Sequence, residues 1–255
     1  HLKTILNNIF KDNKSVIEIL PATPDDPHPI KGGYLEHIVS TGKLANIIKT
    51  HYKKIDSDNY SDLIKDGFRR SGQYVYKPQC HKCSACIPIR ICAKEFKKSQ
   101  SQKRTLKKHS YIDAKVFPLK FEEEHYNLYV NYQNNRHRLS SETNNDITDY
   151  NDFLIKSNVN TKIIEFRAEE KLLMVTIIDQ VKNGISAVYT FYDCNDSRLS
   201  LGTYSILWLL NFCKNENLDY LYLGYWINDS KKMKYKINFK PYELMINGAW
   251  QESPN

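Results

Sequence analysis

The chain has 255 residues, enough for one large domain or for two small ones with hydrophobic cores of their own. It has no run of 18 apolar residues, which excludes a transmembrane helix, and its first residues do not resemble a secretory signal, so we expect no membrane partner. The formal net charge of +8 favours a polyanionic partner such as nucleic acid, although a solvated basic surface would give the same balance.

The first 108 residues are expected to form an N-terminal arm followed by a small cysteine-containing region. Four prolines and two adjacent glycines within residues 21–33 predict a loop or an extended arm. A short helix is predicted over Ser57–Asp66, because Asp56 or Ser57 can cap its start and Gly67 ends it. The segment from Lys94 to Lys108 holds seven Lys or Arg against one acid, and we place a domain boundary just after it.

Residues 109–255 alternate between helix and strand patterns. The predicted helices are Phe121–Arg138, Asp149–Ile155 and Leu201–Asn215, and the predicted strands are Ala114–Phe117, Thr161–Phe166, Leu172–Asp179, Ile185–Tyr192 and Tyr220–Trp226. Lys182–Gly184 predicts a hairpin turn, and Ser230–Lys236 is expected to begin another helix. These elements together predict an α+β fold with a mixed sheet.

Three of the six cysteines are closely spaced, at Cys80, Cys83 and Cys86. Two overlapping C-x-x-C spacings place thiolates on one tight loop, which suits zinc or an iron–sulfur cluster. A fourth ligand would have to come from Cys92, His81 or a distant residue. Because no second C-x-x-C pair completes the pattern, reduced cysteines that pack a small turn are the simpler interpretation. Clustered thiols of either kind favour a reducing compartment, so we expect the cytoplasm.

Several motifs occur together and in order along the chain. They are Gly67–Gly72, Tyr76–Pro78, the three cysteines with Pro88 and Arg90, Phe96 with Ser99, Ser186–Asp193, Leu201–Tyr204, Leu221–Trp226, Lys231–Lys236 and Phe239–Pro241. On these motifs the chain resembles bacterial aspartate/glutamate leucyltransferases, which are related to the arginyl-tRNA–protein transferases. The resemblance covers residues 55–250, whereas residues 1–53 lack the cysteine that usually opens the family's sequence.

The resemblance implies an activity, a fold and a set of partners. The activity is aminoacyl transfer from leucyl-tRNA to the N-terminal Asp or Glu of acceptor proteins, which marks them for degradation; an arginyl donor is the alternative within the family. The fold is an acetyltransferase-like (GNAT-type) domain over residues 109–255. The ester on tRNA is already activated, so the enzyme mainly positions its two partners, and no cofactor is required.

We expect cations and aromatic rings to contact these substrates. The expected contacts are Arg69, Arg70, Tyr76, Arg90, Tyr225, Trp226, Lys232 and Lys236. Guanidinium groups suit the acidic acceptor residue, the basic run from Lys94 to Lys108 suits tRNA phosphates, and aromatic rings suit the terminal adenine. Tyr222 is instead expected in the sheet core.

A general base would help the acceptor amine to lose its proton. Asp179 and Asp193 are the candidates because each follows a predicted strand, although a turn or cap aspartate would look the same. His125 is expected at the surface of its helix.

Two rival functions remain at this point. The first is an acyl-CoA transferase, which would need a glycine-rich turn; Arg198–Thr203 has a single glycine. The second is a non-catalytic RNA-binding protein with a metal knuckle, which explains the charge and the cysteines but not the enzyme-like motifs.

Overall fold

The computed structural model describes residues 55–78, 83–137, 146–195 and 200–253, together with the backbone of two further strands, β1 (Glu18–Ala22) and β2 (Ala45–Lys49). A small sheet has the strand order β1-β2-β4-β3, and a large sheet has the order β12-β11-β5-β10-β9-β8-β7-β6. The other strands are β3 (Arg69–Ser71), β4 (Tyr74–Pro78), β5 (Ile87–Cys92), β6 (Asp113–Pro118), β7 (Thr161–Ala168), β8 (Lys171–Val181), β9 (Gly184–Tyr192), β10 (Tyr220–Trp226), β11 (Tyr242–Ile246) and β12 (Ala249–Glu252).

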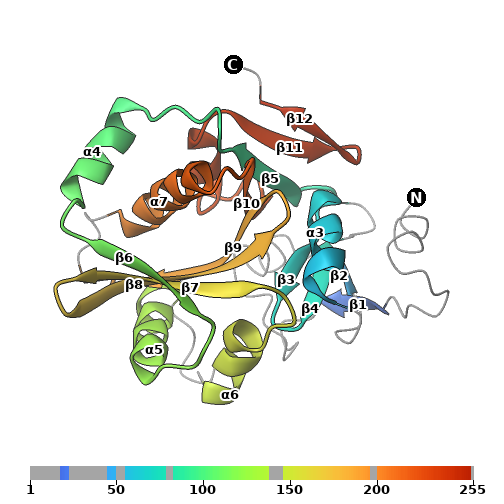
Figure 1. The fold of residues 1–255 in the computed structure, drawn as a ribbon. Coiled ribbons are helices and arrows are strands. Elements are labelled where there is room, and N and C mark those ends of the chain that lie inside the picture. The colour runs from blue at the N-terminus through green and yellow to red at the C-terminus, as the bar shows by residue number, and fades with distance from the viewer. Residues whose placement is uncertain are drawn as a thin grey trace.

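Helices cover both faces of the large sheet (Figure 1). Helix α7 (Leu201–Asn215) packs on one face, and α5 (Glu123–His137) lies on the other with α6 (Ile147–Tyr150) and a following π-helical turn, η2 (Asn151–Ile155). Both faces are therefore dry, and eight consecutive residues of β8, from Leu172 to Asp179, are buried. This explains why that strand reads as a continuous apolar run rather than as an alternating one.

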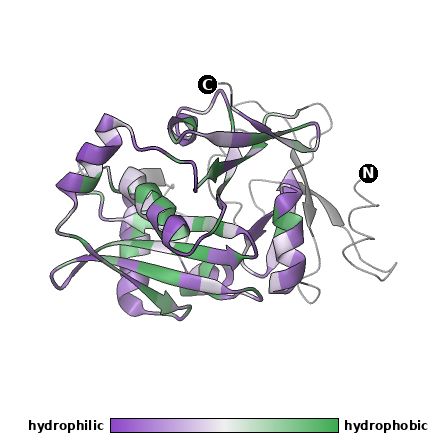
Figure 2. Ribbon diagram, turned by 45° about the horizontal axis from the view of Figure 1, so that its top comes forward, coloured by the Kyte–Doolittle hydropathy of each residue, from purple (hydrophilic) through white to green (hydrophobic). Residues whose placement is uncertain are grey.

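Local sequence fixes where two of the helices begin. Helix α3 (Ser57–Lys65) begins where the Asp56 carboxylate accepts a hydrogen bond of 2.8 Å from the Asn59 N–H. Helix α4 (Gln100–Lys108) begins at Ser99 with a capping box that includes Gln102. In Figure 2, α4 is largely hydrophilic, whereas α7 carries more apolar residues, most of which are buried.

The structure confirms the expected α+β class and most predicted elements. Helix α7 and strand β10 have the predicted bounds, and α3, α5, β6, β7, β8 and β9 differ from prediction by a few residues at their ends. Ser230–Lys236 does not form an α-helix; turns lead instead into a short 3₁₀-helix, η4 (Lys234–Asn238). No helix among the described residues is long and apolar enough to cross a membrane.

Strand β5 joins the two predicted domains. Its residues precede the expected boundary at 108, yet the strand lies inside the large sheet between β11 and β10. The hairpin of β3 and β4 also packs against the rest of the chain through its turn: Gly72 donates its N–H to the Phe153 oxygen at 3.0 Å. A Cβ at Gly72 would lie 2.1 Å from the Asp152 oxygen, and φ is +58°, so this close approach requires glycine.

Candidate active site

The site is built where two parallel strands separate. Strands β9 and β10 pair only over Gly184–Ser186 and Tyr220–Tyr222. Beyond Tyr222, the register of β10 against β5 shifts, and Gly224 adopts a φ of +72°. Because the strands no longer pair there, backbone carbonyls on both strands accept hydrogen bonds from side chains instead. We call this region the β9–β10 gap.

Arg69 enters the gap from β3. Its Nη2 donates to the carbonyl oxygens of Ala187 at 2.9 Å and Val188 at 2.6 Å, both on β9. Its guanidinium also lies directly against Gly224, where a Cβ would be 1.6 Å from Nη1. Gly224 is therefore required for Arg69 to reach its place, and Arg69 connects the N-terminal hairpin to both strands.

Lys236 occupies the β10 side of the same gap. Its Nζ donates to the carbonyl oxygens of Leu223 at 2.9 Å and Tyr225 at 2.5 Å, and the residue is 7% exposed. Burial, and then the positive charge of Arg69, lower the pKa of Lys236 to about 7. Two basic side chains that are 167 positions apart in sequence thus lie close enough for the charge of Arg69 to lower the pKa of Lys236.

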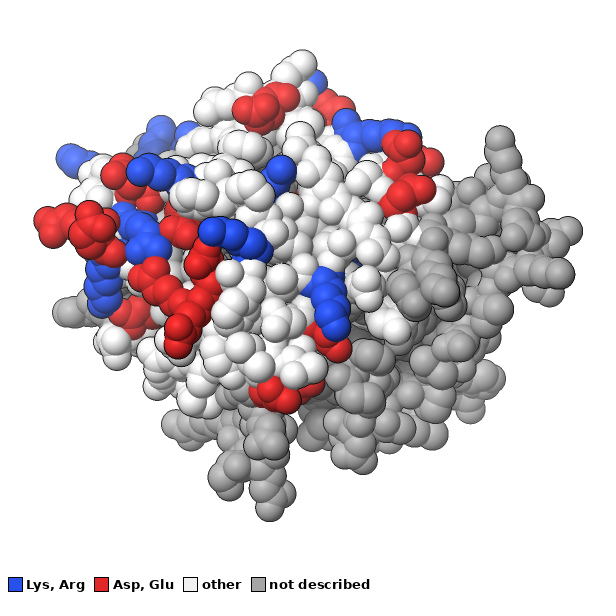
Figure 3. Space-filling model, turned by 60° about the horizontal axis from the view of Figure 1, so that its bottom comes forward, with Lys and Arg blue, Asp and Glu red and all other residues white. Residues whose placement is uncertain are grey.

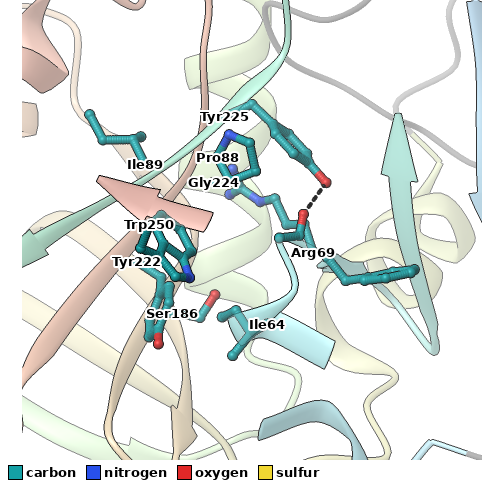
Figure 4. Close-up of a pocket in the computed structure, with 11 residues that line it drawn as sticks. Ile64, Arg69, Pro88, Ile89, Ser186, Tyr222, Gly224, Tyr225 and Trp250 are labelled. Atoms are coloured by element: carbon teal, nitrogen blue, oxygen red, sulfur yellow. Dashed lines mark hydrogen bonds between the residues drawn. The ribbon is translucent and has the colours of Figure 1, made fainter. Parts of the chain in front are cut away.

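A pocket opens beside the gap and shares Arg69 and Gly224 with it (Figure 4). It is lined by Ile64, Gly67, Phe68, Arg69, Pro88, Ile89, Ser186, Tyr222, Gly224, Tyr225 and Trp250. The Tyr225 hydroxyl donates to the Gly67 oxygen at 2.9 Å, and the Trp250 indole N–H donates to the Lys65 oxygen at 2.8 Å. The first bond holds the α3–β3 segment on β10, and the second joins the C-terminal hairpin to α3.

Arg70 and Asp179, two of the expected site residues, are instead bound to each other. Arg70 Nε and Nη2 donate to the two Asp179 carboxylate oxygens, each at 2.7 Å, and both side chains are fully buried. Arg70 also donates to the Gly72 oxygen, and the Thr161 hydroxyl donates to Asp179 at 2.6 Å. The Asp179 carboxylate is hydrogen-bonded on both oxygens, and neither side chain of the pair is exposed. The pair therefore belongs to the structural framework around the gap.

The guanidinium of Arg90 is also bound by other groups of the protein. Its guanidinium lies between the rings of Tyr220, 3.7 Å away, and Trp250, 4.2 Å away, and its Nε donates to Glu243 at 2.5 Å. The residue is 8% exposed. Arg90 therefore supports the pocket wall through Trp250, and its charge is balanced by Glu243.

The remaining expected contacts lie at differing distances from the gap. The Tyr76 and Tyr225 rings are 6.2 Å apart, so Tyr76 lies next to the site. Trp226 is partly buried against the main core, and its indole Nε1 has no acceptor among the described residues. Lys232 is exposed on the turn before η4. Tyr222 is 3% exposed, as expected for sheet core, and also lines the pocket.

Asp193 is bonded within the protein, and its role as a general base stays a prediction. It accepts hydrogen bonds from Lys171 Nζ at 2.8 Å and from the Asn195 N–H at 3.0 Å. Partial burial alone would raise the pKa of Asp193, but the hydrogen bonds from Lys171 and Asn195 lower it overall. The expectation for His125 is wrong: it is 2% exposed because it packs under β7, where Nε2 lies 2.8 Å from Glu165.

The cysteine cluster falls only partly within the described residues. Cys80 lies outside them, whereas Cys83 and Cys86 are partly exposed just before β5. Within the described ranges, no three His, Cys, Asp or Glu side chains gather as metal ligands would. The metal assignment therefore remains a prediction.

Sequence reasoning missed the residues that shape the pocket. Ser186 begins one of the recognised motifs but was not assigned to the site, whereas Ile64 and Trp250 lie in no motif and look like ordinary core residues. The one local signal was Gly224, since a glycine inside a buried strand marks a bulge or a close approach.

The chain that forms this gap matches both family models of the arginine-tRNA–protein transferases. The N-terminal model matches residues 33–104, and the C-terminal model matches residues 124–246. It is 48% identical over 223 residues to an aspartate/glutamate leucyltransferase of Methylobacillus flagellatus, covering 86% of this chain and 90% of the relative. It is 47% identical over 231 residues to that of Polynucleobacter asymbioticus, covering 88% and 91%. The chain belongs to the aspartate/glutamate leucyltransferase family, as its motifs indicated.

Solved structures with related shapes are more distant. One is that of L-PGS from Bacillus licheniformis, with a TM-score of 0.46 and 12% identity, covering 66% of this chain and 58% of that one. Another is a tandem GNAT protein from the clavulanic acid biosynthesis pathway, with a TM-score of 0.39 and 12% identity, covering 94% and 64%.

Proposed function

We propose that this chain transfers leucine from leucyl-tRNA to the α-amine of proteins that begin with Asp or Glu, and thereby marks them for degradation in the cytoplasm. The observation that carries the proposal is the meeting of two lysine-rich segments next to the gap. Gln102 in α4 donates to the Asn238 oxygen in η4 at 3.0 Å across 136 positions of sequence, and the rings of Phe96 and Phe239 are 6.2 Å apart.

These two segments present basic side chains together. Residues on the α4 side that are exposed include Lys97, Lys103, Arg104 and Lys107, and those on the η4 side include Lys231, Lys234 and Lys240. On the face drawn in Figure 3, by contrast, basic and acidic side chains are interspersed around a broad uncharged area. A surface of lysines suits sequence-independent contact with tRNA phosphates, which positions the tRNA without reading its bases.

The second segment leads directly into the gap through Lys236. In the proposed reaction, the acceptor amine attacks the ester carbonyl, a C–N bond forms, the C–O bond to the ribose breaks, and the amine's proton ends on the ribose oxygen. Positive charge from Arg69, and from Lys236 in its protonated form, would stabilise the oxyanion that develops and would attract an acidic acceptor residue. No atom changes its oxidation state in this reaction, so the reaction consumes no redox cofactor.

A transfer assay tests the activity. Labelled leucyl-tRNA or arginyl-tRNA is mixed with the protein and with peptides that begin with Asp, Glu, Ala or Lys. We expect label to move from leucyl-tRNA to the Asp and Glu peptides alone. Transfer from arginyl-tRNA would keep the class and change the donor, whereas tRNA binding without transfer from either donor would favour the RNA-binding alternative.

The tRNA surface has its own test. Lys103→Gln with Lys107→Gln should weaken tRNA binding and lower its salt dependence by about one unit of slope for each phosphate that the protein no longer neutralises. Lys156→Gln, at the end of η2 on the α6 side of the sheet, is the matched control and should leave both quantities unchanged. Equal effects of the three substitutions would contradict the assignment of this surface.

A further inference from the structure

The hydrogen bonds of Lys236 in the β9–β10 gap match those of a neutral amine. A protonated lysine has three N–H donors, whereas a neutral one has two donors and a lone pair. Among the described residues, Lys236 Nζ has two acceptors, the carbonyl oxygens of Leu223 at 2.9 Å and Tyr225 at 2.5 Å. Two N–H groups satisfy both carbonyls, so the lone pair of the neutral amine is left to accept a proton.

The strand pairing explains why these carbonyls bind a side chain. Tyr225 is opposite Pro88 of β5, and a proline has no N–H to donate across the pair. The register of β10 against β5 shifts between Tyr222 and Tyr225, so Leu223 has no partner residue on β5. Lys236 reaches both carbonyls from η4 and donates to them in place of a strand.

The surroundings of Lys236 oppose a second positive charge. The residue is 7% exposed, and the charge of Arg69 acts on it from β3, whereas no acidic side chain of the described residues pairs with it. Burial, and then Arg69, lower its pKa to about 7, so the neutral form is well populated near neutral pH. The same charge acts on Tyr60, Tyr76 and Tyr225, whose hydroxyls stay neutral there because burial raises the pKa of each.

The proposed reaction needs a group that accepts a proton and then returns it. The acceptor's α-amine must lose a proton when it attacks the ester, and the ribose oxygen must gain one when the C–O bond breaks. The two aspartates predicted for this role, Asp179 and Asp193, are bonded to Arg70 and Lys171. We propose that the neutral amine of Lys236 takes the proton from the acceptor amine and that the resulting ammonium returns it to the ribose oxygen. This inference rests on the proposed transfer from leucyl-tRNA.

The two proton transfers leave the protein unchanged. As the C–N bond forms, the proton of the acceptor nitrogen passes to Nζ through one water, because little of Lys236 is exposed and a general base can act across a single water. The ammonium adds its charge to that of Arg69 while the oxyanion exists. The like charge of Arg69 then favours release of the proton to the ribose oxygen as the C–O bond breaks.

Lys236→Arg separates proton transfer from charge. Arginine keeps a positive charge and donors for the two carbonyls, but it stays protonated and so cannot accept a proton. We expect kcat/KM for an Asp peptide, per folded molecule, to fall by about 100-fold or more, as is typical when an acid–base group is lost. Lys214→Arg, at an exposed lysine of α7, is the matched control and should keep the wild-type rate.

The pH dependence of kcat/KM gives a readout that a structural role would not move. In the wild type, the rate should rise as Lys236 loses its proton near pH 7. Arg69→Met removes the charge that lowers the pKa of Lys236, so this rise should move to higher pH, whatever the remaining rate. The α-amine of the free peptide titrates at about 7.7–8.0 in every variant, so its own contribution stays in place. The rise near pH 7 should be absent in Lys236→Arg and unchanged in Lys214→Arg.

Each result either supports or overturns the assignment. A folded Lys236→Arg that keeps the wild-type rate, or a rise that does not move in Arg69→Met, would overturn it while the proposed transfer stands. Loss of the rise in Asp193→Asn instead would return the role to that aspartate. If Lys236→Arg does not fold, the shift in Arg69→Met decides alone. Absence of transfer by the wild-type protein from either donor would overturn the proposed function, and this inference with it.

Discussion

Arg69 and Arg70 are consecutive residues of β3, yet their side chains lie in opposite surroundings. Arg70 binds a carboxylate through two hydrogen bonds and is sealed from solvent. Arg69 binds neutral carbonyls and keeps its charge next to a second cation, Lys236. The strand places alternate side chains on opposite faces, so one face of β3 anchors the hairpin while the other brings charge to the gap. Arg70 is balanced by a carboxylate and holds structure, whereas Arg69 donates to neutral carbonyls, and its charge is the one that we propose acts on a substrate.

Loss of Arg70 should have the largest effect on stability. Arg70→Met leaves Asp179 buried without its partner, and breaking a buried ion pair typically costs about 3–5 kcal/mol. Thermal and urea unfolding should show this loss directly. The double variant Arg70→Met with Asp179→Leu should recover part of it, because no charge is then stranded. If Arg70→Met were as stable as the wild type, Arg70 would not be part of the structural framework.

Loss of Arg69 should affect activity more than stability. Arg69→Met removes positive charge from the gap, and loss of one such stabilising group typically lowers kcat by about 100-fold. The carbonyls of Ala187 and Val188 lose a donor, which costs about 1–3 kcal/mol. Initial rates measured beside an unfolding curve separate the two effects. If Arg69→Met lost stability as severely as Arg70→Met and kept its rate per folded molecule, the contrast between the two residues would fail.

The pH dependence of stability should report on Lys236. Its pKa is about 7 in the folded protein against 10.5 for an ordinary lysine, so the unfolded chain binds more protons between these values. Stability therefore rises with pH across that window, and the full penalty is present below pH 7. Lys236→Met should flatten the slope between pH 7 and 10 in urea titrations. Lys214→Met, which removes an exposed lysine bonded to the Phe96 oxygen, should leave the slope unchanged.

Sequence patterns predicted the parts of the fold whose signals are local. Leu201–Asn215 and Tyr220–Trp226 have periodic or continuous apolar patterns, and the structure gives them the expected bounds. Strand β5 was not predicted as a member of the large sheet, because Ile87–Cys92 contains a proline and pairs with strands over 120 residues away. Local propensity has no access to such a partner.

The residues of the candidate site were also predicted only in part. Motifs identified Arg69 and Lys236, because the chemistry of the side chain and its motif are visible in the sequence. They did not separate Arg69 from Arg70, since alternation puts the two on opposite faces without saying which face meets Asp179. They also could not find Ile64 or Trp250, whose role comes from the segments that meet around them.

The smallest expected effect is at Tyr225, whose hydroxyl affects the position of Arg69 and not the charges of the gap. Its hydroxyl donates to the Gly67 oxygen at 2.9 Å and lies 3.3 Å from the Tyr76 oxygen, which holds the turn before β3 on the sheet. Tyr225→Phe keeps the ring and the charges of the gap but removes this bond, so it should cost about 1 kcal/mol of stability. Because Arg69 enters the gap from the same turn, transfer should also slow, by less than the decrease in Arg69→Met. Tyr111→Phe, an exposed tyrosine beside α4, is the matched control and should change neither unfolding nor rate. A rate that falls as far in Tyr225→Phe as in Arg69→Met would mean that the hydroxyl takes part in the reaction itself, rather than placing Arg69.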